Sequence, residues 1–295
     1  MQTQQTPPLS MQELTTDFSK LAQKYPPLHS FLKSRNKDNG GYRCSLDFRD
    51  PLALQTLSAA ILSSDFGVND WALPADRLCP PIPSRFEYLC WISQLLELPI
   101  GSSTESSGTT PQSVPSTATK VITGLDIGTG CSCVYPLLGA SAFGWHFLAS
   151  DVDATAYTWA TRNVQKAGFT DKITVRLVQP IKSPLDAPRT DNSNEINDEA
   201  SSSNTSTTDN RSFRNSDLSS NTHGGPLSTA VLESDGTLDF CMCNPPFFAT
   251  AEEAVRAHPM RSCPGAAGEL WCPGGEVAFV SSIVGDSVRA FFAVF

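Results

Sequence analysis

The run Asn244-Pro245-Pro246-Phe247, called the tetrad below, directly follows the apolar stretch 238–243. Such a stretch predicts a buried strand that delivers the tetrad at its carboxyl end. The Asn244 side-chain oxygen and the Pro245 carbonyl can accept both N–H bonds of a planar amino group, and two consecutive prolines hold the turn rigid. Phe247 or Phe248 can stack on a base, as pockets for flipped bases require. The tetrad therefore predicts chemistry on an exocyclic or amide nitrogen.

A glycine-rich turn provides the second chemical signal. The apolar run 121–127 enters it, and Gly128 and Gly130 would let the backbone approach a ligand closely. Ser132 can add a hydroxyl group or a backbone N–H. A G-x-G pair alone is a weak signal, because an ordinary strand-to-helix turn explains it equally well. The third glycine of the fuller motif is absent, since Cys131-Ser132-Cys133 stands in its place.

Two acids make the turn more informative. Asp126 precedes it, and Asp151 ends the next predicted strand, 25 residues later. A dinucleotide site needs no carboxylate at the first position, whereas a site for the cationic methionine moiety of S-adenosylmethionine commonly has one. A carboxylate at the second position can bind both ribose hydroxyls. With the tetrad downstream, these acids predict an S-adenosylmethionine-dependent methyltransferase.

The elements that must position these residues alternate between strand and helix patterns. We predict a helix over 154–167 that closes on Gly168, and a last amphipathic helix that carries Val277 through Val288. Strands are predicted over these four ranges: 121–127, 145–149, 173–178 and 238–243. The alternation predicts an α/β fold, a class I (Rossmann-like) methyltransferase sheet, over 120–295.

An N-terminal helical module is predicted over 11–100. Its first helix would stack Leu14, Phe18 and Leu21, and its second would run from the cap Asp50 to Gly67. A third would open with the capping box Ser84-x-x-Glu87, and a hairpin is predicted around 39–41. Residues 1–10 and the Ser/Thr/Pro/Gly linker 101–119 are predicted to be disordered.

Charge and cysteine content narrow the class of protein. An acidic insert at 184–236, predicted to be disordered, carries −6 of the net charge of −9, which excludes a uniformly basic nucleic-acid coat but not a local basic groove. Nine cysteines without an export signal indicate a reduced intracellular setting. Apolar runs shorter than 18 residues predict no membrane span. The C-x-C pairs lack zinc-knuckle spacing, so no metal is predicted.

Three segments around these motifs resemble one family. LDIGTGCSCVYPLLGA (125–140), FLASDVD (147–153) and DFCMCNPPFFA (239–249) are similar to the methyltransferase-like protein 16 family of RNA adenine-N6 methyltransferases. That family has a bacterial branch acting on large-subunit ribosomal RNA. SLDFRDPLALQTL (45–57) and RLCPPIPSRFEYLCWI (77–92) resemble its helical leader. The resemblance implies a structured RNA hairpin as substrate, such as U6 small nuclear RNA, and favours the nucleus over the cytoplasm.

The resemblance also implies roles for particular residues. Gly128 would face the cofactor, Asp151 would bind its ribose, and Arg85 would reach its carboxylate. Lys182 or Ser183 lies where the family closes a loop over the cofactor. The tetrad would be catalytic, and Asn244 would also contact the cofactor.

The sequence departs from the family at both ends. Residues 1–19 contain no Lys or Arg, so phosphate contacts there are lost. Weaker RNA-binding candidates are Arg43, Arg256 and Arg261. The usual fold supplies three more strands, so we expect a C-terminally truncated sheet with the Asn244 strand near its edge. The segment 290–295 would begin a fifth strand.

Two alternative functions remain open from the sequence. A glutamine-N5 protein methyltransferase of release-factor type uses the same Asn-Pro-Pro logic on an amide, although Phe247 stands where that family generally has Tyr. A catalytically silent RNA- or protein-binding fragment would keep the tetrad without a complete sheet.

Overall fold

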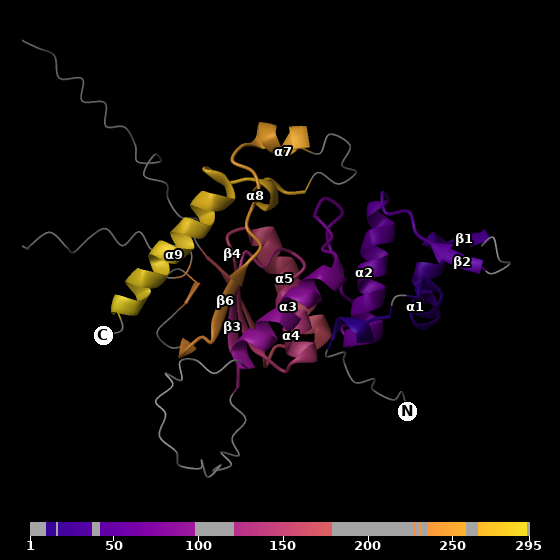
Figure 1. Ribbon diagram of the computed structural model, residues 1–295, viewed down its shortest axis with the longest axis horizontal. Helices are drawn as coiled ribbons and strands as arrows, with labels where there is room; N and C mark the ends of the chain where they lie inside the picture. Colours follow the sequence, from indigo (N-terminus) through magenta and orange to yellow (C-terminus); the bar gives the residue numbers. More distant parts are fainter. Residues whose placement is uncertain are drawn as a thin grey trace, which may run out of the picture.

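A four-stranded parallel sheet forms the centre of the protein in the computed structural model (Figure 1). The structure describes residues 10–15, 17–36, 42–97, 121–178, 227, 230–231, 235–257 and 265–293. The strands lie in the order β5-β4-β3-β6. Their bounds are β3 Thr123–Ile127, β4 His146–Asp151, β5 Ile173–Leu177 and β6 Phe240–Cys243. All four match the predicted strands, and among the described strands β6 lies at an edge, as expected.

Helices cover both faces of this sheet. Helices α4 (Val134–Ala142) and α5 (Ala154–Ala167) pack on one face, and α9 (Gly275–Ala293) covers the other through Ile283. The predicted start and stop of α5 are confirmed, since Asp153 caps it and Gly168 ends it in the left-handed conformation. The result is the three-layered α/β arrangement that the alternation predicts.

The C-terminal segment corrects one prediction. Helix α9 continues to Ala293, where the sequence led us to expect a new strand from residue 290. No Gly or Pro occurs after Gly285, so nothing in the sequence ends the helix earlier. One side of α9 is exposed at Val277, Val284 and Val288, as expected for an uncovered helix face.

The end of the acidic insert also differs from expectation. The structure describes few residues between 184 and 236, but Leu227 and Ala230 are buried against the sheet face that α9 covers. Asp235 forms a bidentate ion pair with Arg176 of β5. These contacts tie Leu227, Ala230 and Asp235 to the folded core, because buried apolar side chains and a paired carboxylate stabilise that packing.

The N-terminal leader is mostly helical, with one hairpin. Its elements are η1 Met11–Glu13, α1 Phe18–Lys24, η2 Pro26–Phe31, β1 Lys33–Asn36, β2 Tyr42–Ser45, α2 Pro51–Phe66 and α3 Ile82–Glu97. The predicted α2 is confirmed from its cap Asp50 to Gly67, and β1 pairs with β2 as an antiparallel hairpin.

Two local predictions for the leader are wrong. Leu14 and Leu21 do not share one helix, because Asp17 accepts the Ser19 N–H and starts α1 only at Phe18. Ser84 is not an N-cap, since α3 already begins at Ile82 and the Ser84 hydroxyl donates to the Pro81 carbonyl. The consecutive prolines 80 and 81 place the helix start earlier than the capping box indicated.

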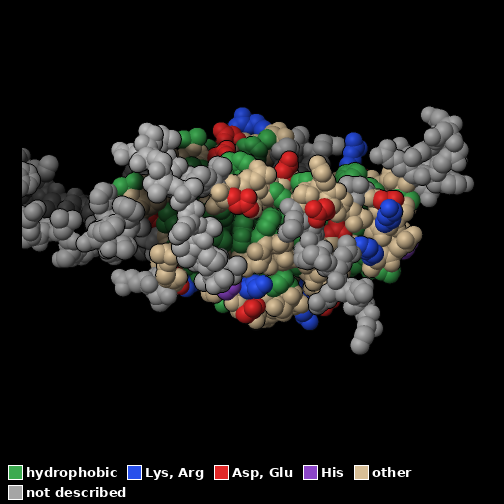
Figure 2. Space-filling view, turned by 60° about the horizontal axis from the view of Figure 1, so that its bottom comes forward, with side chains coloured by type: hydrophobic (Ala, Val, Ile, Leu, Met, Phe, Trp, Pro, Cys, Tyr) green, Lys and Arg blue, Asp and Glu red, His purple; other side chains and the backbone are tan. Residues whose placement is uncertain are grey.

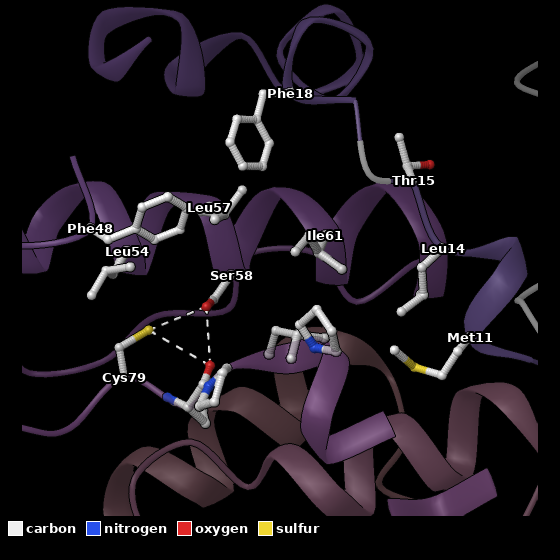
Figure 3. Close-up of a pocket in the computed structure, with 14 residues that line it drawn as sticks. Met11, Leu14, Thr15, Phe18, Phe48, Leu54, Leu57, Ser58, Ile61 and Cys79 are labelled. Carbon is white, nitrogen blue, oxygen red and sulfur yellow. Dashed lines mark hydrogen bonds between the residues drawn. The ribbon is translucent and has the colours of Figure 1, made fainter. Parts of the chain in front are cut away.

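The leader and the sheet share one hydrophobic core. Phe86 of α3 is fully buried beside Phe66 of α2 and stacks on Phe143 at the end of α4. A cavity of about 630 Å³ lies within the leader between α1, α2 and residues 79–83 (Figure 3). Its lining is mostly apolar; the polar exceptions are Thr15 and a small hydrogen-bonded group of Ser58, Cys79 and the Pro80 carbonyl. None of the predicted site residues lines this cavity.

The connection 67–81 between α2 and α3 fastens the leader to the sheet. The fully buried Asn163 of α5 donates to the carbonyls of Ala72 and Cys131, both at 3.0 Å, and accepts the Ala72 N–H. Trp71 adds a hydrogen bond from its indole nitrogen to the Ser132 carbonyl at 2.9 Å. The connection is therefore held at the end of the glycine turn.

Replacing Asn163 should loosen this junction. Asn163→Ala leaves two buried carbonyls and one N–H without their partner, so we expect the free energy of unfolding to fall by about 2 kcal/mol. Urea unfolding followed by circular dichroism measures it. Thr158→Ala, at an exposed position of the same helix, is the matched control and should change stability little. Equal effects of the two substitutions would contradict the assignment.

Candidate active site

Three segments meet at the carboxyl edge of the sheet. Ile127 of β3 pairs with Ser150 of β4 on one side and with Cys243 of β6 on the other. Because the strands are parallel, the glycine turn after Ile127 lies between Asp151 and Asn244. The structure thus brings the tetrad together with the turn and its acids, which lie far before it in the sequence.

The glycine turn has the conformation that glycine adopts without strain. Gly128 and Gly130 have φ values of 74° and 64°, and a Cβ atom on either would meet nothing within 4 Å. Two hydrogen bonds fix the turn to β4, because the N–H groups of Gly128 and Thr129 donate to the Ser150 carbonyl at 2.9 and 3.0 Å. The backbone therefore faces open space that a ligand can occupy.

The segment that replaces the third glycine keeps part of its geometry. Cys133 has a φ of 48°, a left-handed conformation that is costly for a residue with a side chain. Its thiol is fully buried, and burial raises its pKa, which keeps it protonated and inert. Ser132 is half-buried at the start of α4, and its carbonyl is already engaged by Trp71.

Asp126 and Thr129 carry polar atoms that lack a partner. Asp126 is 1% exposed, and among the described residues neither its Oδ2 atom nor the Thr129 Oγ1 atom has a hydrogen-bond partner. Burial raises the pKa of Asp126 to about 7, and the charge of Asp151 adds to the rise, whereas Thr129 and Arg85 act against it. An unpaired buried carboxyl is costly, so a cationic ligand at this point would relieve the cost.

Asp151 is held in place by backbone groups. Its Oδ2 atom accepts the Gly130 N–H at 2.8 Å, and its Oδ1 atom accepts the Asp153 N–H at 2.9 Å. Burial raises its pKa, although the hydrogen bonds from the backbone oppose the rise. Each oxygen keeps a lone pair, so the carboxylate can accept further hydrogen bonds from a pair of hydroxyls.

Arg85 reaches the same site from α3. Its guanidinium lies 5.6 Å from the centre of the Tyr135 ring and is close enough to Asp126 to lower the pKa of that acid. The side chain is half-buried, so it is not the solvated helix-start arginine that its sequence position alone would indicate.

The tetrad forms an open ledge after β6. Asn244 is exposed and Phe247 is 50% exposed, while Pro245 and Pro246 are half-buried. Beyond the tetrad, Phe248 forms an isolated β-bridge with Trp271: its N–H donates to the Leu270 carbonyl at 3.0 Å, and its carbonyl accepts the Cys272 N–H at 3.0 Å. An exposed amide and an exposed ring on a fixed backbone suit a planar substrate that arrives from solvent.

The remaining predicted residues are scattered or lie outside the described residues. Lys182, Ser183 and Arg261 lie outside them. Arg43 stands in β2, opposite Arg35 in the hairpin register. Arg256 is exposed on α7 (Ala251–Ala257). Figure 2 shows the Lys and Arg side chains of its visible face spread singly among acidic ones rather than gathered in one patch.

Sequence reasoning gave no role to three residues that the structure places around the site. Trp71 and Asn163 anchor the connection 67–81 at the glycine turn, and Arg77 pairs with Asp153. A polar Asn on the otherwise apolar side of a predicted helix was the only signal for Asn163.

Two further observations concern the described part of the chain. None of its helices combines the length and apolar character needed to cross a membrane. Within the same residues, no group of three or more His, Cys, Asp or Glu side chains is arranged to hold a metal ion.

Fold and site together define a class of protein. The parallel sheet with helices on both faces, and a glycine turn at its carboxyl edge, are those of a Rossmann-like methyltransferase. Comparison with known families agrees, because residues 10–201 and 195–294 match a family described as RNA methyltransferase. The chain belongs to this RNA methyltransferase family.

Two curated relatives represent the branches of the family. The chain is 32% identical over 289 residues to ribosomal RNA large subunit methyltransferase F of Pseudomonas savastanoi, which covers 92% of the chain and 70% of the relative. It is 34% identical over 281 residues to RNA N(6)-adenosine-methyltransferase mettl16 of Xenopus laevis, with 92% of the chain and 40% of that longer protein covered.

Solved structures of the human protein METTL16 share the fold. Its catalytic domain in complex with MAT2A 3′UTR hairpin 6 matches with a TM-score of 0.62 at 30% identity, over 94% of this chain and 75% of that one. Its N-terminal domain in complex with SAH (S-adenosylhomocysteine) matches with a TM-score of 0.54 at 30% identity, over 92% and 74%.

Proposed function

We propose that this RNA methyltransferase transfers the methyl group of S-adenosylmethionine to the N6 amine of an adenosine in a structured RNA. The observation that carries the proposal is the placement of Asn244 beside the glycine turn and its acids, at one edge of the sheet. The relatives named for N6-adenosine methylation and the neighbours with bound SAH and RNA hairpins support it.

The residues at the glycine turn fit this cofactor. Asp126 and Thr129 offer buried polar atoms without a partner, and the cationic methionine moiety would supply one. Asp151 has lone pairs that would accept the ribose hydroxyls, Arg85 would bind the carboxylate, and Gly128 leaves open space. When bound, the cofactor supplies an electrophilic methyl group.

The tetrad would hold and orient the acceptor amine. The Asn244 side-chain oxygen and the Pro245 carbonyl accept its two N–H bonds, which draws electron density toward the nitrogen and fixes the direction of its lone pair. Phe247 stacks on the flipped base. No dedicated base is required, because the proton released from the methylated nitrogen passes to water.

Labelled methyl transfer tests the proposal. The protein is incubated with tritiated S-adenosylmethionine and total RNA, and the RNA is digested to nucleosides. We expect the label in N6-methyladenosine. Label in another nucleoside would refute the N6 assignment, and label in glutamine of an added protein extract would instead support the release-factor type of enzyme.

The substrate RNA is a further part of this proposal. We expect a hairpin, because METTL16 structures with hairpins share this fold. U6 small nuclear RNA, with a nuclear location, is our preferred target over ribosomal RNA. Separate reactions with a U6 transcript and a large-subunit ribosomal RNA transcript distinguish the two, and transfer only to the ribosomal transcript would overturn the preference.

A further inference from the structure

Arg77 is a nearly buried arginine that the mechanism above does not use. It lies in the connection 67–81, and its side chain is 10% exposed. Its Nη1 atom donates to the Asp153 Oδ2 atom at 2.5 Å. A buried arginine paired in this way is costly to leave without its partner, so the ion pair fixes the position of both side chains.

Asp153 continues this contact to the site. Its Oδ1 atom accepts the Thr155 N–H at the start of α5, and its own N–H donates to Asp151. Asp151 in turn accepts the Gly130 N–H. An unbroken chain of hydrogen bonds therefore runs from Arg77 to the glycine turn.

The charges along this chain give Arg77 a second effect. Burial raises the pKa of Asp151, and the charge of Asp153 raises it further. Burial also acts to raise the pKa of Asp153, but the Thr155 N–H and Arg77 outweigh it, so that the net pKa is lowered. Other titratable groups that interact with Asp151 are Asp126 of β3, Cys131 and Cys133 of the glycine turn, and Glu269 of α8 (Ala267–Leu270). Arg77 is therefore the cation that offsets the repulsion from Asp153.

The residue after Arg77 contacts the loop behind the tetrad. The Leu78 N–H donates to a Glu269 carboxylate oxygen at 3.5 Å, and the same oxygen accepts the Ala266 N–H at 2.8 Å. A Cβ atom on Gly265 would lie 2.9 Å from the Leu78 Cγ atom, so the two segments approach closely. Helix α8 (Ala267–Leu270) leads directly into the residues that pair with Phe248.

We infer that Arg77 is a positioning residue, which orients Asp151 and balances its charge through Asp153 so that the cofactor ribose can bind. The inference rests on the proposed function, because it takes Asp151 as the ribose-binding acid. Through Arg77, as through Arg85, the helical leader would contribute to the affinity for the cofactor.

Binding of S-adenosylhomocysteine by the full chain tests this inference. Calorimetry gives its Kd for the wild type, Arg77→Gln and Asp151→Ala over a pH range that extends from mildly acidic to mildly alkaline. We expect Arg77→Gln to weaken binding about 10-fold near pH 7. The loss should grow as the pH is lowered, because the uncompensated Asp153 raises the pKa of Asp151 further. A loss of the same size at every pH, or no loss, would overturn the inference.

A double variant separates the charge effect from a loss of fold. In Arg77→Gln/Asp153→Asn the repelling carboxylate is removed while Asn still caps α5, so we expect affinity to recover at least threefold relative to Arg77→Gln. No recovery would count against the inference. Arg77→Lys, which keeps the charge, should bind within about threefold of the wild type and serves if Arg77→Gln does not fold.

The outcomes also distinguish this inference from the proposed function. If Asp151→Ala loses affinity and Arg77→Gln does not, only the role of Arg77 is wrong. If neither variant changes the Kd, the ribose assignment of Asp151 fails with it. A wild-type chain that does not bind S-adenosylhomocysteine would refute the proposed cofactor itself.

Discussion

Asn244→Ala should lower the rate of methyl transfer to RNA at least about 100-fold while leaving cofactor affinity within a few-fold of the wild type. The side chain is exposed on a ledge whose backbone is held by the Phe248 pairing, so its loss removes an acceptor without disturbing the core. Single-turnover transfer of labelled methyl measures the rate, and calorimetry measures the affinity for S-adenosylhomocysteine.

The control for this variant is Asn69→Ala. Asn69 is exposed in the turn after α2, where it bonds only locally to Ser63 and Gly67. It should transfer methyl at the wild-type rate. If Asn244→Ala keeps more than a tenth of that rate, the tetrad does not hold the acceptor amine and the proposed chemistry is wrong.

Asp126→Asn should make the free protein more stable and the cofactor complex weaker. The pKa of Asp126 is about 7 in the folded chain, against an ordinary value of 3.8. The folded state therefore binds the proton more tightly than the unfolded state, so stability falls as the pH rises from about 4 to 7 and stays low above that. Asparagine cannot ionise, so Asp126→Asn avoids this loss of stability. We expect the free energy of unfolding of the variant at pH 8 to exceed that of the wild type by about 2 to 4 kcal/mol.

Binding should change in the opposite direction. The cationic methionine moiety favours the ionised form of Asp126, so the ratio of wild-type to variant affinity for S-adenosylmethionine should grow as the pH rises through about 7, reaching about 10-fold or more. Taking the ratio cancels titration of the cofactor itself. Urea unfolding at pH 5 and 8 and calorimetry over the same range measure the two effects.

Asp65→Asn provides a matched control of opposite sign. Asp65 is as buried as Asp126, but its carboxylate accepts the Thr15 N–H and the Thr15 hydroxyl, both at 2.8 Å. Asparagine has one acceptor oxygen where the carboxylate has two, and its NH2 group would face a donor, so this variant should be less stable than the wild type. A lower stability for Asp126→Asn as well would show that the Asp126 carboxyl has a structural partner and is not reserved for a ligand.

Local sequence patterns predicted most of the secondary structure correctly. The four strands, the hairpin, and the ends of α2 and α5 follow from apolar runs and from cap residues such as Asp50 and Gly168, whose effect acts within a few residues. The predictions fail where two local signals compete. The prolines before α3 outweighed the Ser84 capping box, and the absence of a helix terminator carried α9 through residue 290.

The sequence by itself also determined the chemistry, because the residue types of the glycine turn, its acids and the tetrad each limit what the site can do. Their meeting at one edge depends on strand order, which places β6 next to β3 although α4, β4, α5, β5 and a long insert separate them in the sequence. Only the tertiary structure decided that the Asp126 Oδ2 atom lacks a hydrogen-bond partner among the described residues, and that Arg85 lies close to Asp126. It also decided that Arg77 and Asn163 join the leader to the site. Burial and pairing are set by packing between distant segments, and no local pattern encodes which buried polar group will find a partner.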